Sequence, residues 1–371
     1  MSDQQLQKPT VVVGMSGGVD SSVAAALLLE QGYSVIGVTM KTYDFDRAGG
    51  NEGNETSCCG LDASNDARIV AVKLGIPHYV ADFTEQFGRE VIDNFVAEYL
   101  KGRTPNPCVI CNRVIKWGAL LDKAVSLGAE YIATGHYARR CYDEESGRYF
   151  IARGADVRKD QSYALWGLNQ AALQRTLFPL GELRKSEVRA IAALLGLKTA
   201  TKEESFEICF VPDNDYRRFI HEQDPGLQAR LAGGGVLRDG RKVGEHKGFV
   251  NYTIGQRSGL GAHGERVYVT GIEPATNTVT IGGDADLLQR ELTAGQLNCM
   301  AIAEIGESLR VEAAIRYKDT ASPATVIPLG GGRIRLVFDQ PKRAITPGQS
   351  VVMYQAGKLI GGAVIERASG Q

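Results

Sequence analysis

The residues with the clearest chemical potential form one glycine- and serine-rich stretch near the N-terminus, Gly14-Met15-Ser16-Gly17-Gly18-Val19-Asp20-Ser21-Ser22. Glycines let the backbone turn sharply and approach a ligand closely. The apolar run before this stretch predicts a strand, and the Ala- and Leu-rich run after it predicts a helix. A loop in that setting directs its N–H groups and the helix N-terminus at one point, which suits an anion. Because the serine hydroxyls add donors, we expect that anion to be a phosphate or a pyrophosphate.

Two common phosphate-binding loops are excluded by residues that this stretch lacks. A Walker loop requires Gly-Lys-Ser/Thr after its spacer residues, and the dinucleotide fingerprint requires Gly-x-Gly-x-x-Gly at the start of a helix. Neither pattern is present in the stretch. It resembles instead the PP-loop signature of ATP pyrophosphatases, enzymes that split ATP into AMP and pyrophosphate. The alternative, a turn that binds nothing, is the weaker hypothesis for so long a match between a strand and a helix.

A second stretch combines cysteines with prolines and basic residues. It is Thr104-Pro105-Asn106-Pro107-Cys108-Val109-Ile110-Cys111-Asn112, surrounded by Lys101, Arg103, Arg113 and Lys116 with no acidic residue between 101 and 116. The prolines favour an extended segment and exclude a helix until after the second one. Basic residues beside reactive thiols favour a nucleic-acid contact over a merely solvated surface. Cys209 lies in an apolar setting. Cys58 and Cys59, which are adjacent to each other in the sequence, are interpreted as accessory or inert.

The elements that would position these residues alternate between strand and helix from residue 10 to about 135, which predicts a doubly wound parallel sheet. The expected strands are residues 11–13, 35–40, 78–82 and 131–137, and the expected helices are 62–74, 85–100 and, further along, 185–195. Ligands bind beyond the carboxyl ends of such strands. Met40, Gly135 and His136 are therefore candidate contacts, with a core methionine and a structural histidine as the alternatives.

After about residue 213 the helical patterns fade. Short strands separated by glycines follow, among them residues 244–246, 249–254, 267–272 and 278–281. From about residue 295, strands recur at the spacing typical of a barrel. We therefore predict a PP-loop nucleotide-binding domain of α/β class over residues 1–213, a central β-rich domain over 214–285 and a C-terminal β-barrel over 286–371.

Length and composition limit the class of protein. A chain of 371 residues can hold two or three domains. Although 43% of the residues are hydrophobic, no apolar run reaches the ~18–20 residues of a membrane helix. The polar first residues lack the apolar region of a signal peptide, so we expect a cytoplasmic protein. Seven cysteines are too few for a disulfide scaffold in a chain of this length. Because the net charge is only -1, a nucleic acid would have to be bound by local basic patches.

Several separated motifs together resemble one family, the bacterial tRNA-specific 2-thiouridylases. Besides the PP-loop and residues 104–112, they are Ala-Thr-Gly-His-Tyr at 133–137, Lys-Asp-Gln-Ser-Tyr at 159–163, Glu-Ile-Cys-Phe at 207–210 and Tyr-Thr-Ile-Gly-Gln-Arg at 252–257. The resemblance extends from Val11 to about Glu366. It implies an enzyme that makes 2-thiouridine at the wobble position of certain tRNAs.

The implied chemistry agrees with the residue types. A uridine carbonyl oxygen is a poor leaving group, so ATP would first adenylylate it and release pyrophosphate into the PP-loop. Backbone donors and Mg²⁺ would stabilise the charge on that leaving group. A sulfur nucleophile would then displace AMP, which requires cysteine thiolates or persulfides. The sulfur would come from an upstream donor, a cysteine desulfurase or a sulfur-relay protein.

Matched residue by residue, the resemblance assigns a role to individual positions. Gly14 to Ser21, Met40 and Gly135 would bind ATP. Cys111 would be the nucleophile and Cys209 the persulfide carrier. The target base would lie against Asn106, Pro107 and Cys108, and further tRNA contacts would come from His136, Lys159, Asp160, Gln161, Arg316, Tyr317 and Gln349. The basic–aromatic pair Arg316 and Tyr317 suits stacking on bases and phosphate binding.

One position departs from the family pattern. Many members carry Asp where this chain has Cys108, so an acidic helper is missing. Two hypotheses remain open. In the first, Cys108, Cys111 and Cys209 hold a [4Fe–4S] cluster with one iron open to sulfide. This arrangement resembles that of some related tRNA thiolases. In the second, Cys111 and Cys209 form a persulfide and disulfide relay and Cys108 is a spectator. Structural zinc is weaker, because it usually takes four ligands.

Overall fold

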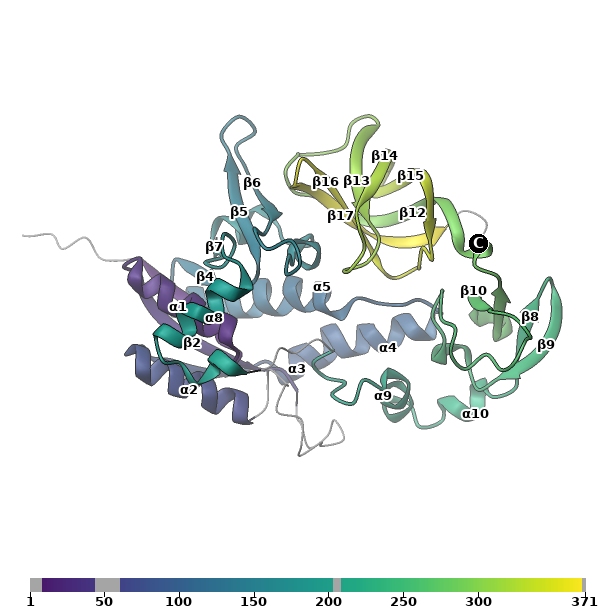
Figure 1. Cartoon of the computed structure of the whole chain (residues 1–371), viewed down its shortest axis with the longest axis horizontal. Helices are drawn as coiled ribbons and strands as arrows, with labels where there is room; N and C mark the ends of the chain where they lie inside the picture. The colour runs from purple at the N-terminus through teal and green to yellow at the C-terminus, as the bar shows by residue number, and fades with distance from the viewer. Residues whose placement is uncertain (1–8, 44–60, 203–207, 369–371) are drawn as a thin grey trace, which may run out of the picture. The chain divides into compact units, whose positions relative to one another are not determined.

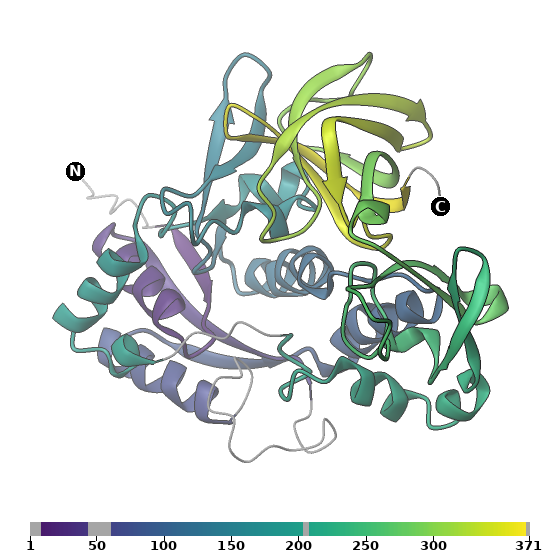
Figure 2. The ribbon, with the colours of Figure 1, turned by 45° about the vertical axis from the view of Figure 1, so that its right-hand side comes forward.

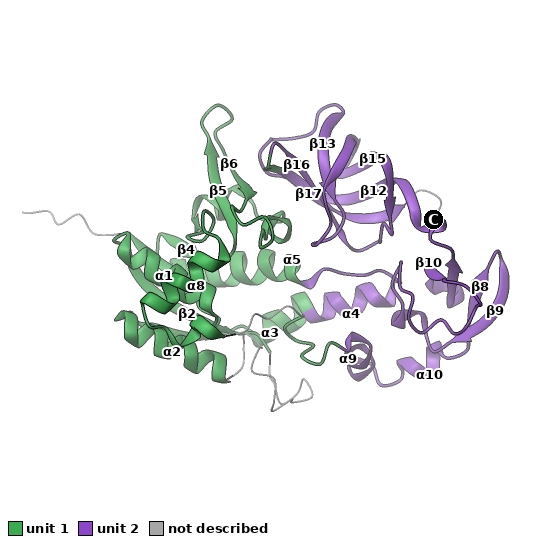
Figure 3. Cartoon of the chain, in the orientation of Figure 1, with its two compact units in different colours: residues 1–91, 108–214, 357–359 green, residues 92–107, 215–356, 360–371 purple. Residues whose placement is uncertain are grey.

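The computed structural model describes residues 9–43, 61–202 and 208–368, which divide between two compact units (Figure 3). Unit 1 comprises residues 1–91, 108–214 and 357–359, and unit 2 comprises 92–107, 215–356 and 360–371. Cys58, Cys59 and Glu207 of the Glu-Ile-Cys-Phe motif lie outside the described residues. Within the described ranges, no helix combines the length and the apolar character needed to cross a bilayer.

Unit 1 is built on a five-stranded parallel sheet with the order β3-β2-β1-β4-β7 (Figure 1). Its strands are β1 (Thr10–Gly14), β2 (Ser34–Lys41), β3 (His78–Asp82), β4 (Tyr131–Ala133) and β7 (Thr176–Leu177). On one face, Val11 and Val13 pack in a common core with α1 (Val19–Glu30), α2 (Leu61–Leu74) and α8 (Lys185–Leu194). Side chains alternate along a strand, so Val12 points to the other face, and α6 (Leu120–Ser126) packs on β1 and β4. The prediction of a doubly wound sheet is confirmed.

The helix expected over residues 85–100 is present and contains a π-helical turn. It runs through α3 (Thr84–Phe87), η1 (Gly88–Ile92) and α4 (Asp93–Leu100). The next helix begins at the second proline itself, one residue earlier than expected, because proline is tolerated in the first turn of a helix. It starts with α5 (Pro107–Cys111) and continues through the π-helical η2 (Asn112–Ala119) into α6. π-Helical turns are rare and often lie at functional sites. The other short elements of unit 1 are the hairpin β5 (Ala138–Asp143) and β6 (Arg148–Arg153), η3 (Ser162–Leu165), α7 (Gln170–Gln174) and η4 (Lys198–Thr201).

Unit 2 contains two β structures. The central sheet has the order β10-β11-β8-β9, with β8 (Gly234–Arg238), β9 (Arg241–His246), β10 (Tyr268–Glu273) and β11 (Thr278–Gly282). The C-terminal strands follow the order β12-β15-β14-β13-β16-β17, and β12 also pairs with β17, which closes a barrel around an apolar core (Figure 2). These strands are β12 (Leu288–Cys299), β13 (Leu309–Ala314), β14 (Ser322–Gly330), β15 (Arg333–Arg343), β16 (Ser350–Gln355) and β17 (Lys358–Ala368). The predicted central β region and C-terminal barrel are confirmed.

Two expectations for the chain beyond residue 213 were wrong. Residues 249–254 form the 3₁₀ turn η5 (Phe249–Asn251) and a loop, because the adjacent Phe249 and Val250 are both buried and a strand would point them to opposite faces. Helices also continue past residue 213, as α9 (Tyr216–Gln223) and α10 (Leu227–Leu231). They are too short to produce a clear periodic pattern. Two 3₁₀ turns, η6 (Pro274–Thr276) and η7 (Ala285–Leu287), complete unit 2.

Candidate active site

The loop between β1 and α1 is held by hydrogen bonds from both of its ends. The Met15 N–H donates to the Val38 carbonyl at 2.8 Å, and the Ser16 N–H donates to Ser21 Oγ at 3.2 Å. Ser22 Oγ donates to the Gly18 carbonyl at 2.8 Å. Among the described side chains, none caps α1 at Gly18. The start of α1 thus lacks a side-chain cap, which suits a loop whose N–H groups bind a phosphate.

Gly17 is the position of this loop where a side chain cannot be placed. Its φ is +68°, and a Cβ would lie 2.1 Å from the backbone oxygen of Ala63 in α2. We expect Gly17→Ala to displace the loop and weaken ATP binding about 10-fold or more, equivalent to about 1.4 kcal/mol, by calorimetry. Gly32→Ala is the matched control, because Gly32 has φ +90° and nothing lies within 4 Å of its Cβ position. Equal effects of the two substitutions would contradict this explanation.

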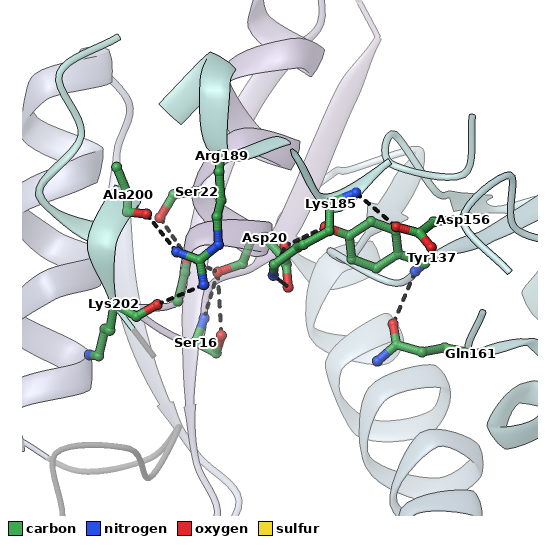
Figure 4. Close-up of polar contacts among 12 residues, drawn as sticks. Ser16, Asp20, Ser22, Tyr137, Asp156, Gln161, Lys185, Arg189, Ala200 and Lys202 are labelled. Atoms are coloured by element: carbon green, nitrogen blue, oxygen red, sulfur yellow. Dashed lines mark hydrogen bonds and ion pairs between the residues drawn. The ribbon is translucent and has the colours of Figure 1, made fainter. Parts of the chain in front are cut away.

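The carboxylate of Asp20, in the first turn of α1, is bound by two other elements of unit 1 (Figure 4). Lys185 Nζ donates to its two oxygens at 2.7 and 2.8 Å, and Tyr137 OH donates to Oδ1 at 2.7 Å. The Lys185 side chain is only 11% exposed. This ion pair neutralises a carboxylate that would otherwise repel phosphates at the loop. Lys185 was not predicted as a site residue from the sequence. A lysine in the first turn of a helix is unfavourable beside the positive end of the helix dipole, so its position could have indicated a specific carboxylate partner.

Met40 and Gly135 both lie at the carboxyl edge of the sheet, as expected. Met40 is half-buried near the end of β2 and pairs with Ala81. Gly135 follows β4, which ends at Ala133 and is shorter than the strand expected over residues 131–137. A Cβ on Gly135 would lie 2.8 Å from the Ser21 nitrogen, so this glycine lets the segment approach the first turn of α1. Contact of either residue with ATP stays a prediction.

His136 is a packed histidine. Its Nδ1 lies 2.7 Å from Thr134 Oγ1, and its ring centroid lies 5.6 Å from that of Trp117 and 6.1 Å from that of Phe178. Burial, and secondarily the charge of Lys116, hold the pKa of His136 well below its usual range. At neutral pH it is therefore uncharged, and a contact with tRNA would have to be a neutral hydrogen bond rather than a phosphate ion pair.

The lowered pKa of His136 predicts how stability depends on pH. The unfolded chain would hold a proton on this ring below about pH 6.5 while the folded protein would not. The stabilisation is thus complete above that pH and declines as the pH falls. We expect the free energy of unfolding of His136→Asn, measured by urea titration, to decrease less between about pH 7 and pH 5 than that of the unsubstituted protein. Identical decreases in the two proteins would contradict the assignment.

The side chains of Asp160 and Gln161 have partners within unit 1. Asp160 Oδ1 accepts from the N–H groups of Gly154 and Ser162 at 3.0 and 3.1 Å, and Gln161 Oε1 accepts from the Tyr137 N–H at 3.0 Å. Both residues thus shape the loop beside Tyr137, a role that the sequence analysis did not foresee. Lys159 lines a cavity of about 630 Å³, together with Arg158 and Arg184. The tRNA contacts assigned to residues 159–161 stay predictions.

Each cysteine-bearing segment is anchored by a hydrogen bond at or beside its cysteine. Cys111 ends α5, and the buried Asn112 after it donates from Nδ2 to the Ala164 carbonyl at 2.9 Å. The Cys209 carbonyl accepts a hydrogen bond from Tyr43 OH. Cys111 and Cys209 are partly exposed, and Cys108 is exposed. These cysteines are therefore at least partly exposed residues on anchored segments.

The described part of the chain contains no group of three His, Cys, Asp or Glu residues arranged to hold a metal ion. Cys108, Cys111 and Cys209 all belong to that part. In this structure the three thiols are therefore not arranged as ligands of a cluster or of zinc, and binding of a [4Fe–4S] cluster stays a prediction. No step of the reaction is derived through either group.

The remaining candidate residues belong to unit 2. Arg316 and Tyr317 are exposed in the loop after β13, while Asn106 is half-buried and Pro107 is buried. Gln349 is half-buried, and its Nε2 donates to the carbonyls of Thr104 and Pro105 at 3.0 and 3.2 Å. From the sequence, Gln349 is expected only as a tRNA contact, and these bonds cannot be foreseen because no local pattern links residues so far apart in the chain.

Comparison with known proteins follows the same division of the chain. Residues 9–213 match the family model of the tRNA methyl transferase HUP domain, and residues 232–283 match that of the tRNA methyl transferase PRC-barrel domain. Residues 289–365 match the aminomethyltransferase beta-barrel domain. The chain is also 51% identical over 367 residues to the tRNA-specific 2-thiouridylase MnmA of Salinibacter ruber, a match that covers 98% of this chain and 96% of that protein.

The chain belongs to the tRNA-specific 2-thiouridylase family. It is likewise 53% identical over 357 residues to the 2-thiouridylase MnmA of Moorella thermoacetica, covering 96% of this chain and 99% of that protein. The corresponding protein of Pelotomaculum thermopropionicum is 51% identical over 362 residues, covering 97% and 98%. The family resemblance inferred from the separated motifs is thus confirmed across nearly the whole 2-thiouridylase sequence.

Proposed function

We propose that this chain is an ATP-dependent tRNA-uridine 2-sulfurtransferase that makes 2-thiouridine at the wobble position of tRNA. The observation that carries the proposal is the combination, in one member of the 2-thiouridylase family, of an ordered PP-loop with Cys111 and Cys209 on anchored segments. The PP-loop supplies ATP chemistry and the thiols supply a route for sulfur. We retain the domain boundaries 213/214 and 285/286 as part of this proposal.

In the first step, the C2 oxygen of the uridine attacks the α-phosphorus of ATP. The bond from that phosphorus to the bridging oxygen breaks, and pyrophosphate leaves. The N–H groups at the start of α1 would stabilise the departing charge, with Mg²⁺ shielding the phosphates when bound. Met40 and Gly135 would lie against the nucleotide. Lys185 keeps the charge of Asp20 neutralised, so the loop presents donors rather than a carboxylate to the phosphates.

In the second step, the terminal sulfur of a Cys209 persulfide attacks C2 of the adenylylated uridine, and AMP leaves. The Cys111 thiolate then attacks the Cys209 sulfur, which forms a Cys111–Cys209 disulfide and leaves the terminal sulfur on the base. A cellular thiol must reduce this disulfide, and a cysteine desulfurase or sulfur-relay protein must reload Cys209. Such exchange requires a compartment that keeps thiols reduced, so we infer a cytoplasmic site of action.

An anaerobic thiolation assay tests the function. Iron-free protein would be incubated with unmodified tRNA, ATP, Mg²⁺ and a persulfide donor, and the nucleosides of the tRNA would be identified by mass spectrometry. We expect 2-thiouridine, together with conversion of ATP to AMP that depends on tRNA. If AMP forms at the same rate without tRNA and no thiouridine appears, the chain is instead a PP-loop enzyme of another kind, such as an amidating ligase.

A further inference from the structure

The segment that leads to Cys108, residues 101–106 (the strap), contacts other parts of unit 2 at several points. Arg103 forms an ion pair with Glu98 at 2.6 Å and donates to the Ile365 carbonyl of β17 at 3.3 Å. Thr104 Oγ1 donates to Thr253 Oγ1 at 3.2 Å. Residues 101 and 102 form the turn that ends α4, and residues 103–106 have no secondary structure, so the position of the strap depends on its contacts with other residues of unit 2.

Three further hydrogen bonds join the strap to the barrel residues 344–349 (the barrel turn). The Thr104 N–H donates to the Pro347 carbonyl at 2.8 Å, and Gln349 Nε2 donates to the Thr104 and Pro105 carbonyls. Gly348 has φ +90°, and a Cβ there would lie 2.8 Å from the Thr104 oxygen. The strap backbone thus rests directly on the barrel turn, and Gln349 is the side chain that holds its carbonyls.

The motif Tyr-Thr-Ile-Gly-Gln-Arg at residues 252–257, which had no role from the sequence, meets the same place. Thr253 contacts the strap through Thr104. Gly255 has φ +86°, and a Cβ there would lie 3.0 Å from Cβ of Ala344 in the barrel turn. The motif therefore fixes the barrel turn and the strap against one another within unit 2.

We propose that Gln349 is a positioning residue for sulfur transfer. By donating to the carbonyls of Thr104 and Pro105, it sets the place from which Asn106 and the cysteine helix α5 begin. This inference rests on the proposed function. It differs from the tRNA contact implied by the family resemblance, because the side-chain nitrogen of Gln349 is directed at the protein backbone. A small displacement of a reacting group is enough to slow catalysis severely.

The test compares the isosteric variant Gln349→Glu with the unsubstituted protein. A carboxylate cannot donate to the strap carbonyls and would repel them. We expect kcat for thiolation to fall about 10- to 100-fold, while the KM and the Kd for tRNA stay within about twofold. Gly348→Ala would place a Cβ against the Thr104 backbone and should show the same pattern, so either variant tests the proposal if the other fails to fold.

Matched controls separate positioning from general damage to the barrel. Gln355→Glu removes a donor to the Arg310 carbonyl at the end of β16, and Gly332→Ala changes a glycine with φ +70° and open space around it. Both should keep kcat near that of the unsubstituted protein. Loss of tRNA affinity in Gln349→Glu with kcat unchanged would overturn the proposal in favour of an RNA contact. Unchanged kinetics would also overturn it.

A second measurement does not depend on thiolation. The rate at which iodoacetamide alkylates the exposed Cys108, followed by mass spectrometry without tRNA, reports the order of the strap. We expect faster alkylation in Gln349→Glu and Gly348→Ala than in the two controls. Equal rates in all four proteins would overturn the positioning role. If the unsubstituted protein makes no thiouridine, the proposed function fails while the alkylation rates still decide this inference.

Discussion

Replacing Cys111 with serine is expected to abolish formation of 2-thiouridine while ATP binding stays intact. A serine hydroxyl is not ionised near neutral pH and cannot exchange sulfur with a persulfide, so the loss should be about 1,000-fold or more. Serine and cysteine are close in size, and Cys111 is only partly buried, so the fold should tolerate the change. Mass spectrometry of tRNA nucleosides measures the product, and calorimetry measures ATP affinity.

Two other cysteines of unit 1 serve as controls for this substitution. Burial raises the pKa of the Cys141 thiol on β5, which makes it a poor nucleophile, and Cys141→Ser should retain full activity. Cys108→Ser should also retain most activity if Cys108 is a spectator. Full activity of Cys111→Ser would refute the sulfur-relay mechanism. A loss in Cys108→Ser as large as that in Cys111→Ser would refute the spectator role.

Replacing Lys185 with methionine is expected to produce the second large effect. The substitution leaves the Asp20 carboxylate charged beside the phosphate loop, with the hydroxyl of Tyr137 still bound to it. Because Lys185 is mostly buried and Asp20 is partly exposed, we expect about 2 kcal/mol of lost stability, below the range for fully buried pairs. Repulsion between Asp20 and ATP should lower the affinity for ATP at least about 10-fold, by calorimetry.

The ion pair between Lys202 and Asp66 provides the matched control, because its 2.7 Å separation equals that of Lys185 and Asp20 and it is similarly buried. Lys202→Met should cost stability without changing ATP affinity. The double variant Lys185→Met/Asp20→Asn removes the uncompensated charge and should recover part of the ATP affinity. If the double variant binds ATP no better than Lys185→Met, charge neutralisation is not the role of Lys185.

Local patterns in the sequence were sufficient for most of unit 1 and for the barrel. The PP-loop could be identified because strand, loop and helix are contiguous, so their residue types report directly on geometry. The carboxyl-edge position of Met40 followed from the alternation of strands and helices. Prediction failed for the hairpin β5–β6 and the helix α9, because a charged strand such as Ala138–Asp143 and a helix of eight residues carry little periodic signal.

By itself, then, the sequence determined the class of fold, the phosphate loop and the residue types that carry sulfur chemistry. Only the tertiary structure decided how those residues are held. Lys185 reaches Asp20 across 165 positions of the chain, and Gln349 reaches Thr104 across 245. Such partners leave no local pattern, because an ion pair or a side-chain-to-backbone hydrogen bond needs only closeness in space. The positioning of the site is therefore a property of the folded chain and not of any one motif.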